Sequence, residues 1–337
     1  MNILFSTVGR RGYIVDYFRK HLPESSKLIG TSDRNDCDTE FTSGFFHCDK
    51  SYIVPSIKEE RKYVDELLTI CKKEKVDMLF SFYDYDVYVL SQYLKEFEAI
   101  GIKPVISSHQ INTICFDKIE THKFLKSQGF KTPWTITSDD VAKTEISSYP
   151  VIVKPRFGFG SNAINIANNR SEVEFFLNYH ANEDMIVQEF IEGPEYSFDI
   201  LNDFNGQTVT AVVKRKIKMR AGETDQGYAI KDTRLAECGM KLGSKLGHVG
   251  PLDVDFFIKD NEPYILELNP RFGGAYPITY LAGVDFPKIL IDLFNGELGP
   301  SDYEKYHDYN EGIVMIKDIA FLKDSLLFAA NPFFKSL

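Results

Sequence analysis

The N-terminal third of the chain alternates short apolar runs with helical patterns, and this alternation restricts the fold more than any other feature. The runs ILFSTV, KLIGTS, VDMLFSF and KPVIS are separated by amphipathic segments such as KYVDELLTICKKEK. Strands that alternate with helices form a parallel sheet with helices on its faces, because each crossover brings the chain back to the same edge. The sequence therefore predicts an open, Rossmann-like α/β domain over residues 1–111.

The pattern changes after this first unit. A helix, KIETHKFLKSQG, precedes two strand-like runs that flank a glycine-rich turn, and a further helix and the strand MIVQEFI follow. We expect a small α+β unit over residues 112–190. Beyond it, EYSFDILND, QTVTAVVKRKIKMR, LDVDFFIKD and PYILELN predict an antiparallel sheet, with hairpin turns at NDFNGQ and KDNEP. A third unit, also α+β, would cover residues 191–337.

Composition argues against several classes of protein. A formal net charge of −10 disfavours a nucleic-acid partner, since phosphate backbones are bound by basic surfaces. The sequence has no apolar run long enough to span a membrane, and MNILFSTVGRRG places its apolar stretch before its charges, opposite to a secretory signal. Five scattered cysteines without a C-x-x-C pair indicate neither disulfides nor zinc. We expect a cytoplasmic protein, and the sequence leaves open whether it forms a homo-oligomer.

The stretch YILELNPRFGG has the chemistry of a metal and phosphate site. Glu267 and Asn269 lie two residues apart on a strand and therefore share a face. Their oxygens suit a hard cation such as Mg²⁺, and the planar guanidinium of Arg271 suits a phosphate. Upstream, Asp253 and Asp255 share a face of LDVDFFI, and one of them could meet Glu267 across a hairpin. Two carboxylates placed together repel unless a cation lies between them, although an exposed edge hairpin is the ordinary alternative.

The segment VIVKPRFGFGSNA has the chemistry of a phosphate-binding loop. Lys154 ends an apolar run, and Gly158 and Gly160 follow in a turn whose backbone amides could close over phosphates. The same letters match the dinucleotide fingerprint, but that fingerprint opens a helix, and here the strand-like run NAINIA follows. A β-hairpin lid is therefore favoured.

The segment VQEFIEGPEYSFD could hold a nucleoside. A buried strand that runs into an acidic turn offers backbone groups to a purine edge, and Glu195 could accept hydrogen bonds from ribose hydroxyls. A solvated hinge loop explains the same sequence segment equally well.

Taken in order, Asp117-Lys118, VIVKPRFGFGSNA, VQEFIEGPEYSFD, LDVDFF and YILELNPRFGG resemble the ATP-grasp superfamily, particularly its carbamoyl-phosphate-synthase-like and amino-acid-ligase branch. The resemblance covers nearly the whole chain. It implies a Rossmann-like pre-grasp domain, a small lid and a larger α+β domain, with ATP between the last two. It also implies Mg²⁺, for which Mn²⁺ could substitute.

The resemblance assigns a role to each matching position of this sequence. The lysines that contact the ATP phosphates match Lys118 and Lys154. The loop that closes over them matches residues 157–163, with Gly158, Gly160 and Ser161. The hinge that meets adenine matches Glu189, Phe190 and Ile191, and the ribose-binding acid matches Glu195. The magnesium ligands match Asp255, Glu267 and Asn269, and the arginine that reaches the transferred phosphate and the acyl group matches Arg271.

Similar enzymes use ATP to make an acyl phosphate from a carboxylate, which an amine then attacks. We therefore expect a carboxylate–amine ligase for small amino-acid-like substrates. Two alternatives stay open: a carboxylate or carbamate kinase that releases its acyl phosphate, and a nucleotide-binding regulatory protein without turnover.

Two further segments are candidates for substrate recognition. In the basic segment KRKIKMRAGETDQG we expect Arg220 to bind a substrate carboxylate or phosphate, ahead of Lys214 and Arg215. Basic side chains that protect an edge strand from aggregation are the alternative explanation. In SFYDYDVY, Asp84 follows a strand of the parallel sheet and could meet a substrate amino group, or it could cap a helix.

Overall fold

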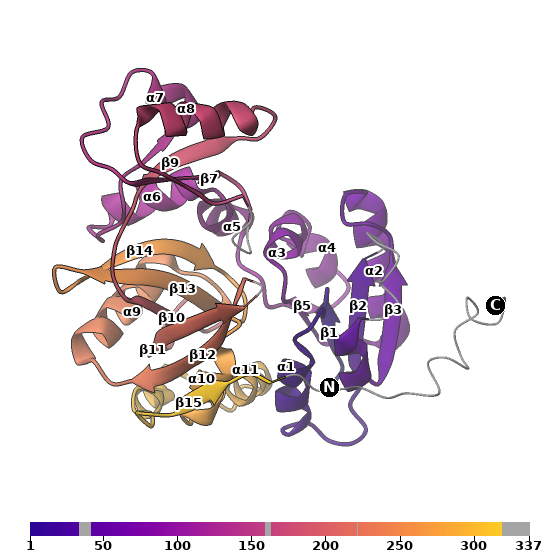
Figure 1. The fold of residues 1–337 in the computed structure, drawn as a ribbon. Helices are drawn as coiled ribbons and strands as arrows, with labels where there is room; N and C mark the ends of the chain where they lie inside the picture. The colour runs from indigo at the N-terminus through magenta and orange to yellow at the C-terminus, as the bar shows by residue number, and fades with distance from the viewer. Residues whose placement is uncertain (34–41, 159–162, 221, 319–337) are drawn as a thin grey trace.

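The computed structural model describes residues 1–33, 42–158, 163–220 and 222–318, and these form three sheets (Figure 1). The first sheet is parallel, with the order β3-β2-β1-β4-β5. Its strands are β1 (Ile3–Ser6), β2 (Leu28–Asp33), β3 (Lys50–Val54), β4 (Met78–Ser81) and β5 (Lys103–Pro104). Its helices are α1 (Gly12–Arg19), η2 (Ser43–His47), α2 (Glu60–Glu74), α3 (Asp84–Leu90) and α4 (Leu94–Glu98). The predicted Rossmann-like domain is confirmed.

The order of this sheet reverses between β1 and β4, so the loops after these two strands open at the same edge. Open α/β sheets bind their ligands at such a reversal. Residues 84–98 form two helices, α3 and α4, with a break between them. The hydroxyl of Ser91 donates to the Tyr88 carbonyl oxygen at the break, a local bond that competes with helix continuation.

The second sheet is antiparallel, with the order β6-β9-β7-β8. Its strands are β6 (Thr135–Thr137), β7 (Val151–Pro155), β8 (Asn165–Ala167) and β9 (Met185–Glu189), and its helices are α7 (Ser138–Val141) and α8 (Arg170–Tyr179). The glycine-rich segment joins the antiparallel strands β7 and β8. The strands before and after this segment thus form the predicted hairpin, and the segment is followed by a strand and not by the helix that the dinucleotide fingerprint requires.

The third sheet has the order β14-β13-β10-β11-β12-β15. Its strands are β10 (Glu195–Asn202), β11 (Thr208–Arg220), β12 (Glu223–Ile230), β13 (Gly250–Lys259), β14 (Glu262–Asn269) and β15 (Val314–Ile316). Its helices are α9 (Thr233–Leu246), α10 (Tyr276–Leu281), α11 (Phe286–Asn295) and η3 (Pro300–Tyr306). The strand β12 was not among the strands expected from the sequence, because ETDQG is polar and has weak strand propensity, but pairing with β11 holds it in the sheet.

Both predicted hairpin turns are present. Asp260 and Asn261 between β13 and β14 have positive φ angles of 52° and 60°, as a type I′ turn requires. In the turn between β10 and β11, the side chain of Asp203 accepts hydrogen bonds from the amides of Asn205 and Gln207, each at 2.8 Å. These turns set the register that brings side chains of neighbouring strands together.

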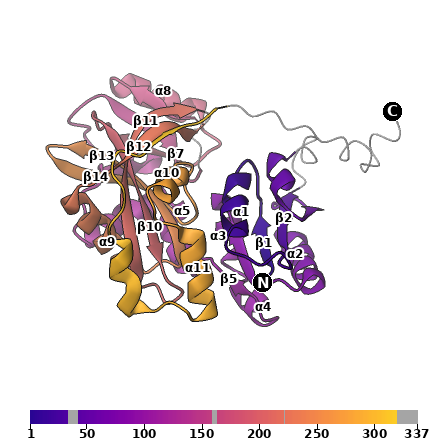
Figure 2. The same cartoon turned by 90° about the horizontal axis from the view of Figure 1, so that it is seen from below.

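The helices α5 (His109–Phe116) and α6 (Lys118–Ser127) lie between the second and third sheets (Figure 1). Cys115 and Leu125 of these helices join the core formed by β10, β11, β13, β14 and α9. The other face of the third sheet shares its core with the first domain, and α11 lies between the two (Figure 2). The rings of Phe18, Phe80 and Phe82 pack around Phe272, which follows β14, at centroid distances of 5.9–6.4 Å.

No helix among the described residues is both long enough and apolar enough to cross a membrane.

The fold contains one buried histidine, His248, whose protonation opposes folding. Burial lowers the pKa of His248 from 6.5 to about 3. Between these values the unfolded chain binds a proton that the folded protein does not, so stability is lost as the pH falls below 6.5. We expect this residue alone to cost about 2 kcal/mol of unfolding free energy between pH 7 and pH 5. Urea unfolding at both pH values should show a smaller loss in His248→Gln, whereas the exposed His307→Gln should behave as wild type. An unchanged pH dependence in His248→Gln would contradict the assignment.

Candidate active site

The carboxylates expected to hold metal meet across the hairpin of β13 and β14. Asp255 lies opposite Glu267, and Asp253 lies opposite Asn269. The prediction that one aspartate of LDVDFFI meets Glu267 is therefore confirmed, and the residue is Asp255. Within the described part of the chain, no three side chains of the His, Cys, Asp and Glu types gather as a metal site. The donors expected from the sequence, Asp255, Glu267 and Asn269, are two carboxylates and an amide, and such hard oxygen ligands fit Mg²⁺.

Two lysines from other elements lie beside Glu267. Lys154, the buried lysine of β7, has its Nζ 3.5 Å from Glu267 Oε1. Lys118 at the start of α6 donates a hydrogen bond from Nζ to the carbonyl oxygen of Gly158 at 2.9 Å. Burial lowers the pKa of Lys154. Burial alone would raise the pKa of Glu267, but the charges of Lys154 and Lys118 keep it below its ordinary value.

One pocket joins this cluster to the first domain. It is lined by residues from α5, α6, the glycine-rich segment, the end of β14 and the start of α3, among them Asp84, Lys118, Gly158, Glu267 and Asn269. The structure thus brings together residues that the sequence separates widely. Gly160 and Ser161 lie outside the described residues.

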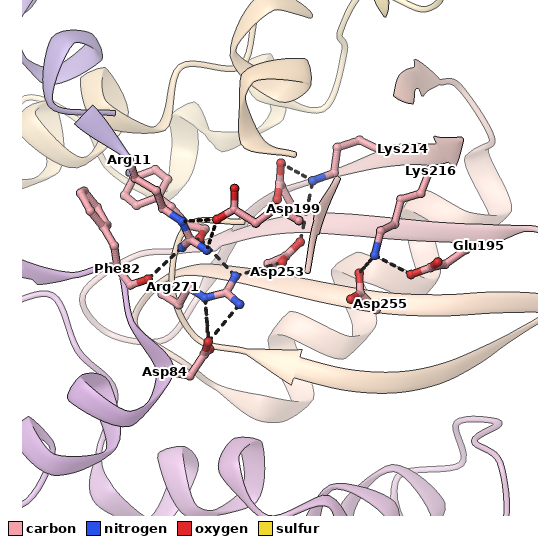
Figure 3. Close-up of polar contacts among 12 residues, drawn as sticks. Arg11, Phe82, Asp84, Glu195, Asp199, Lys214, Lys216, Asp253, Asp255 and Arg271 are labelled. Carbon is pink, nitrogen blue, oxygen red and sulfur yellow. Dashed lines mark hydrogen bonds and ion pairs between the residues drawn. The ribbon is translucent and has the colours of Figure 1, made fainter. Parts of the chain in front are cut away.

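A lysine that sequence reasoning missed, Lys216 of β11, connects the expected ribose acid to the expected metal site. Its Nζ lies 2.9 Å from Asp255 Oδ1 and also donates to Glu195 Oε1 (Figure 3). Burial and the neighbouring carboxylates Asp253 and Glu195 raise the pKa of Asp255 to about 7, and the charge of Lys216 offsets only part of this rise. Strand alternation could have identified Lys216, since it shares a face with Lys214. Arg215 faces the other way and covers the ring of Tyr196.

The expected adenine hinge connects the second sheet to the third. Glu189 ends β9 and accepts a hydrogen bond from Lys259 Nζ at 2.7 Å and from the Trp134 amide at 3.3 Å. Phe190 is half-buried and Ile191 is buried between β9 and β10. These residues stand at the junction that a nucleoside between the two sheets would contact.

Arg271 is held by carboxylates from two domains. Its Nη1 lies 3.0 Å from Asp253 Oδ2, and its Nε lies 3.1 Å from Asp84 Oδ1 at the start of α3 (Figure 3). Burial alone would lower the pKa of Arg271, but the two carboxylates raise it above its ordinary value. The guanidinium is therefore a fixed cation at the end of β14, beside the pocket that Asp84 lines.

The ion pairs continue from Arg271 into the sheet. The buried Lys214 Nζ lies 2.7 Å from Asp199 Oδ2 and 3.9 Å from Asp253 Oδ1. Asp199 also accepts a hydrogen bond from the hydroxyl of Thr279 on α10. Burial alone would raise the pKa of Asp253, but Lys214 and Arg271 keep it below its ordinary value. Asp253 is thus the ion-pair partner of Arg271 and Lys214, whereas Asp255 lies opposite Glu267 in the hairpin.

Two arginines stand at the end of the β11–β12 hairpin that faces the first domain. Arg220 is 52% exposed and pairs with Asp225 at 2.7 Å. It lies opposite Glu223 in the register, and among the described residues it neither pairs with Arg271 nor lines the pocket. Arg11, from the loop after β1, pairs with Glu223 at 3.3 Å and was not among the expected site residues. The paired arginines of TVGRRGY at the edge where β1 ends were the signal in the sequence.

The comparisons with known proteins agree with this geometry. Residues 3–105 match a family model described as a PylC-like N-terminal domain, and residues 115–275 match one described as an ATP-grasp domain. The carbamoyl phosphate synthase large chain of Clostridium botulinum is 22% identical over 326 residues. That match covers 91% of this chain but only 29% of the relative, so this chain spans less than a third of its length.

Two solved structures show the same fold. An L-amino acid ligase from Bacillus licheniformis is 21% identical with a TM-score of 0.67, and the match covers 87% of this chain and 74% of that one. An N5-carboxyaminoimidazole synthetase from Staphylococcus aureus, complexed with ADP, is 18% identical with a TM-score of 0.70, and the match covers 89% and 78%. With the two matched regions in sequence order, the chain combines a PylC-like N-terminal domain with an ATP-grasp domain.

Proposed function

We propose that the protein is an ATP- and Mg²⁺-dependent carboxylate–amine ligase for small amino-acid-like substrates, which forms an acyl phosphate and releases ADP and phosphate. The proposal rests on one pocket. Asp84 of the first domain lines this pocket together with residues that are proposed to bind the nucleotide, namely Lys118, Gly158, Glu267 and Asn269. A pocket shared in this way suits a reaction between a nucleotide phosphate and a second molecule held by the first domain.

The residues proposed to face the nucleotide have the charges and oxygen atoms needed to bind phosphate groups and a metal ion. Bound MgATP would supply the phosphoryl group that activates the substrate carboxylate. Lys118 and Lys154 would neutralise phosphate oxygens, and Asp255, Glu267 and Asn269 would hold the metal. Lys216 would leave one of its two carboxylates when a cation binds there, because Glu195 and Asp255 compete for its single charge.

The residues on the substrate side suit an acid and an amine. The guanidinium of Arg271 would donate to the oxygens of the acyl phosphate, where negative charge develops. The carboxylate of Asp84 would accept hydrogen bonds from the amine. Both groups are held in place before substrate binds, and such positioning supplies much of the catalysis in phosphoryl and acyl transfer.

Measuring ADP and phosphate release with pairs from a panel of amino acids, other metabolite carboxylates and amines tests the proposal. A ligase releases ADP rapidly only when both an acid and an amine are present. Release with the acid alone indicates a kinase of the carbamoyl-phosphate-synthase type. Nucleotide binding without release under any condition indicates a regulatory protein, and either result contradicts the ligase. Repeating the assay with Mn²⁺ tests whether it replaces Mg²⁺.

Arg220 stays a predicted contact of the acid substrate. Its place opposite Glu223 puts it at the end of the hairpin that faces the first domain. Arg220→Gln should raise the KM for the acid about tenfold, the low end for a hydrogen bond between charged groups, because half of the side chain is exposed to water. The KM for ATP should stay the same, and Lys218→Gln on the same strand serves as control. A change confined to ATP would instead assign Arg220 to the phosphates.

A further inference from the structure

Two guanidinium groups converge on a single carbonyl oxygen beside the site. Arg11 Nη1 donates to the Phe272 carbonyl oxygen at 2.6 Å, and Arg271 Nη1 donates to the same oxygen at 3.2 Å. Arg11 also donates to the carbonyl oxygen of Phe82 at 2.9 Å. The side chain of Arg11 is only 12% exposed, so it is a built part of the site and not a surface arginine.

The two arginines differ in how well their charges are balanced. Arg271 has two carboxylate partners, Asp84 and Asp253. Among the described residues Arg11 has one carboxylate partner, Glu223, and Lys317 Nζ also lies 3.2 Å from that carboxylate. Burial alone would raise the pKa of Glu223, but the surrounding cations hold it below its ordinary value. Positive charge is therefore in excess around Arg11, and a bound anion would balance it.

A buried hydroxyl without a partner belongs to the residue two positions after Arg11 in the chain, Tyr13. The Tyr13 hydroxyl at the start of α1 is shielded from solvent and finds no hydrogen-bond partner among the described residues. Burial raises its pKa, and the charges of Arg11, Glu223 and Arg271 act on it. The hydroxyl therefore keeps its proton and can donate it to an anion beside Arg11. A buried polar group without a partner is costly, and a ligand that supplies the partner removes that cost.

The position of Arg11 limits which anion of the reaction it could bind. Arg11 and Asp84 lie on opposite sides of the Arg271 guanidinium (Figure 3). Asp84 lines the pocket shared with Lys118 and Glu267, whereas Arg11 does not line it. An anion at Arg11 is therefore not the carboxylate that receives the phosphoryl group.

We propose that Arg11 and the Tyr13 hydroxyl bind the free carboxylate of the amine substrate, which is accordingly an amino acid and not a simple amine. The substrate carboxylate takes the place of Glu223 as the partner of Arg11, and Glu223 keeps Lys317. This inference rests on the proposed ligase, because it names the class of the amine that the ligase uses. Arg11 is a binding residue, and its loss changes specificity more than it changes fold.

The test compares each amine with and without its carboxylate. The probes are the twenty L-amino acids and β-alanine, each beside its carboxamide, as the amine in the ADP-release assay. We expect wild type to favour the amino acid by roughly tenfold or more in kcat/KM, the contribution of a charged hydrogen bond. Arg11→Gln should bring this ratio close to one, and Arg11→Lys should keep part of it. The neighbouring Arg10→Gln, which changes an exposed arginine, should keep the wild-type ratio.

Glu223→Gln separates substrate binding from a purely structural contact between domains. If Arg11 only ties the first domain to the hairpin, Arg11→Gln and Glu223→Gln lower activity together and leave the ratio unchanged, which would overturn the inference. If Arg11 binds substrate, Glu223→Gln removes a competitor and keeps or increases the ratio. Tyr13→Phe should lower the ratio several-fold, and it carries the test if Arg11→Gln does not fold.

A binding measurement distinguishes failure of this inference from failure of the proposed function. Calorimetric titration of wild type and Arg10→Gln with the amino acids should show binding, and titration with the carboxamides should not. Arg11→Gln should lose this difference. The titration needs no turnover, so absence of ADP release refutes the ligase without deciding on the subsite. Equal binding of amino acids and carboxamides by wild type, or no binding of either, overturns the subsite.

Discussion

Replacing Glu267 by glutamine is expected to lower ADP formation by roughly 10²–10³-fold, the usual effect of removing a group that stabilises transition-state charge. Glutamine keeps the shape of the side chain but removes the negative charge that faces Asp255 across the hairpin and Lys154 across the pocket. The measurement is the initial rate of ADP release at saturating ATP over a range of Mg²⁺ concentrations. The Mg²⁺ concentration needed for half-maximal activity should rise in the variant.

Two controls make this result specific. Glu262→Gln changes a glutamate at the other end of β14 and should leave the rate unchanged. Glu267→Gln also removes a counter-charge from the buried Lys154, so we expect it to cost about 1 kcal/mol of stability in the absence of nucleotide. Melting curves of both variants check that the fold is intact. A Glu267→Gln variant that keeps wild-type turnover and Mg²⁺ dependence would refute the metal assignment.

Replacing Arg271 by methionine should have the largest effect on stability. The change leaves Asp253 buried and Asp84 largely buried without their arginine, and breaking a buried ion pair costs about 3–5 kcal/mol. Urea unfolding measures the loss. Activity should also fall, because Arg271 is proposed to bind the acyl phosphate. Arg271→Lys should restore stability better than activity, since lysine keeps the charge without the planar fork.

A second substitution tests the cause of that instability. If the unpaired carboxylates are responsible, adding Asp253→Asn to Arg271→Met should recover part of the lost free energy. Lys214 limits the recovery, because it also loses a carboxylate neighbour at 3.9 Å. A double variant no more stable than Arg271→Met alone would show that packing around Arg271, and not its charge, holds the site together.

The sequence was most informative where the relevant contacts are local. Strand alternation placed Glu267 and Asn269 on one face, and the hairpin turn at Asp260 and Asn261 brought that face against Asp255. The parallel first sheet followed from alternating strands and helices in the same way. In each case the periodicity of the backbone determines which side chains meet.

Contacts between distant segments could not be predicted in this way. Arg11 and Glu223 are 212 positions apart, and Arg271 and Asp84 are 187 apart. Periodicity assigns a residue to a face, but the packing of the first domain against the third sheet decides what that face meets. For this reason Asp84 was expected to meet an amino group or cap a helix, and its pairing with Arg271 was not foreseen. The roles predicted for the site residues stay predictions until the variants are measured.

The aromatic cluster around Phe272 limits how the parts of this protein can be exchanged. Because the first domain and the third sheet share one core, a chimaera that takes residues 1–105 from another protein would place foreign side chains around Phe272 and α11. Overfilled or underfilled contacts there would displace Arg271, the residue that precedes Phe272 in the chain. Grafting the first domain to transfer substrate preference would therefore require the donor's segment from Arg271 to α11 as well. The N-terminal domain and the segment from Arg271 to α11 together form the unit that can be inherited or engineered independently. The N-terminal domain alone does not.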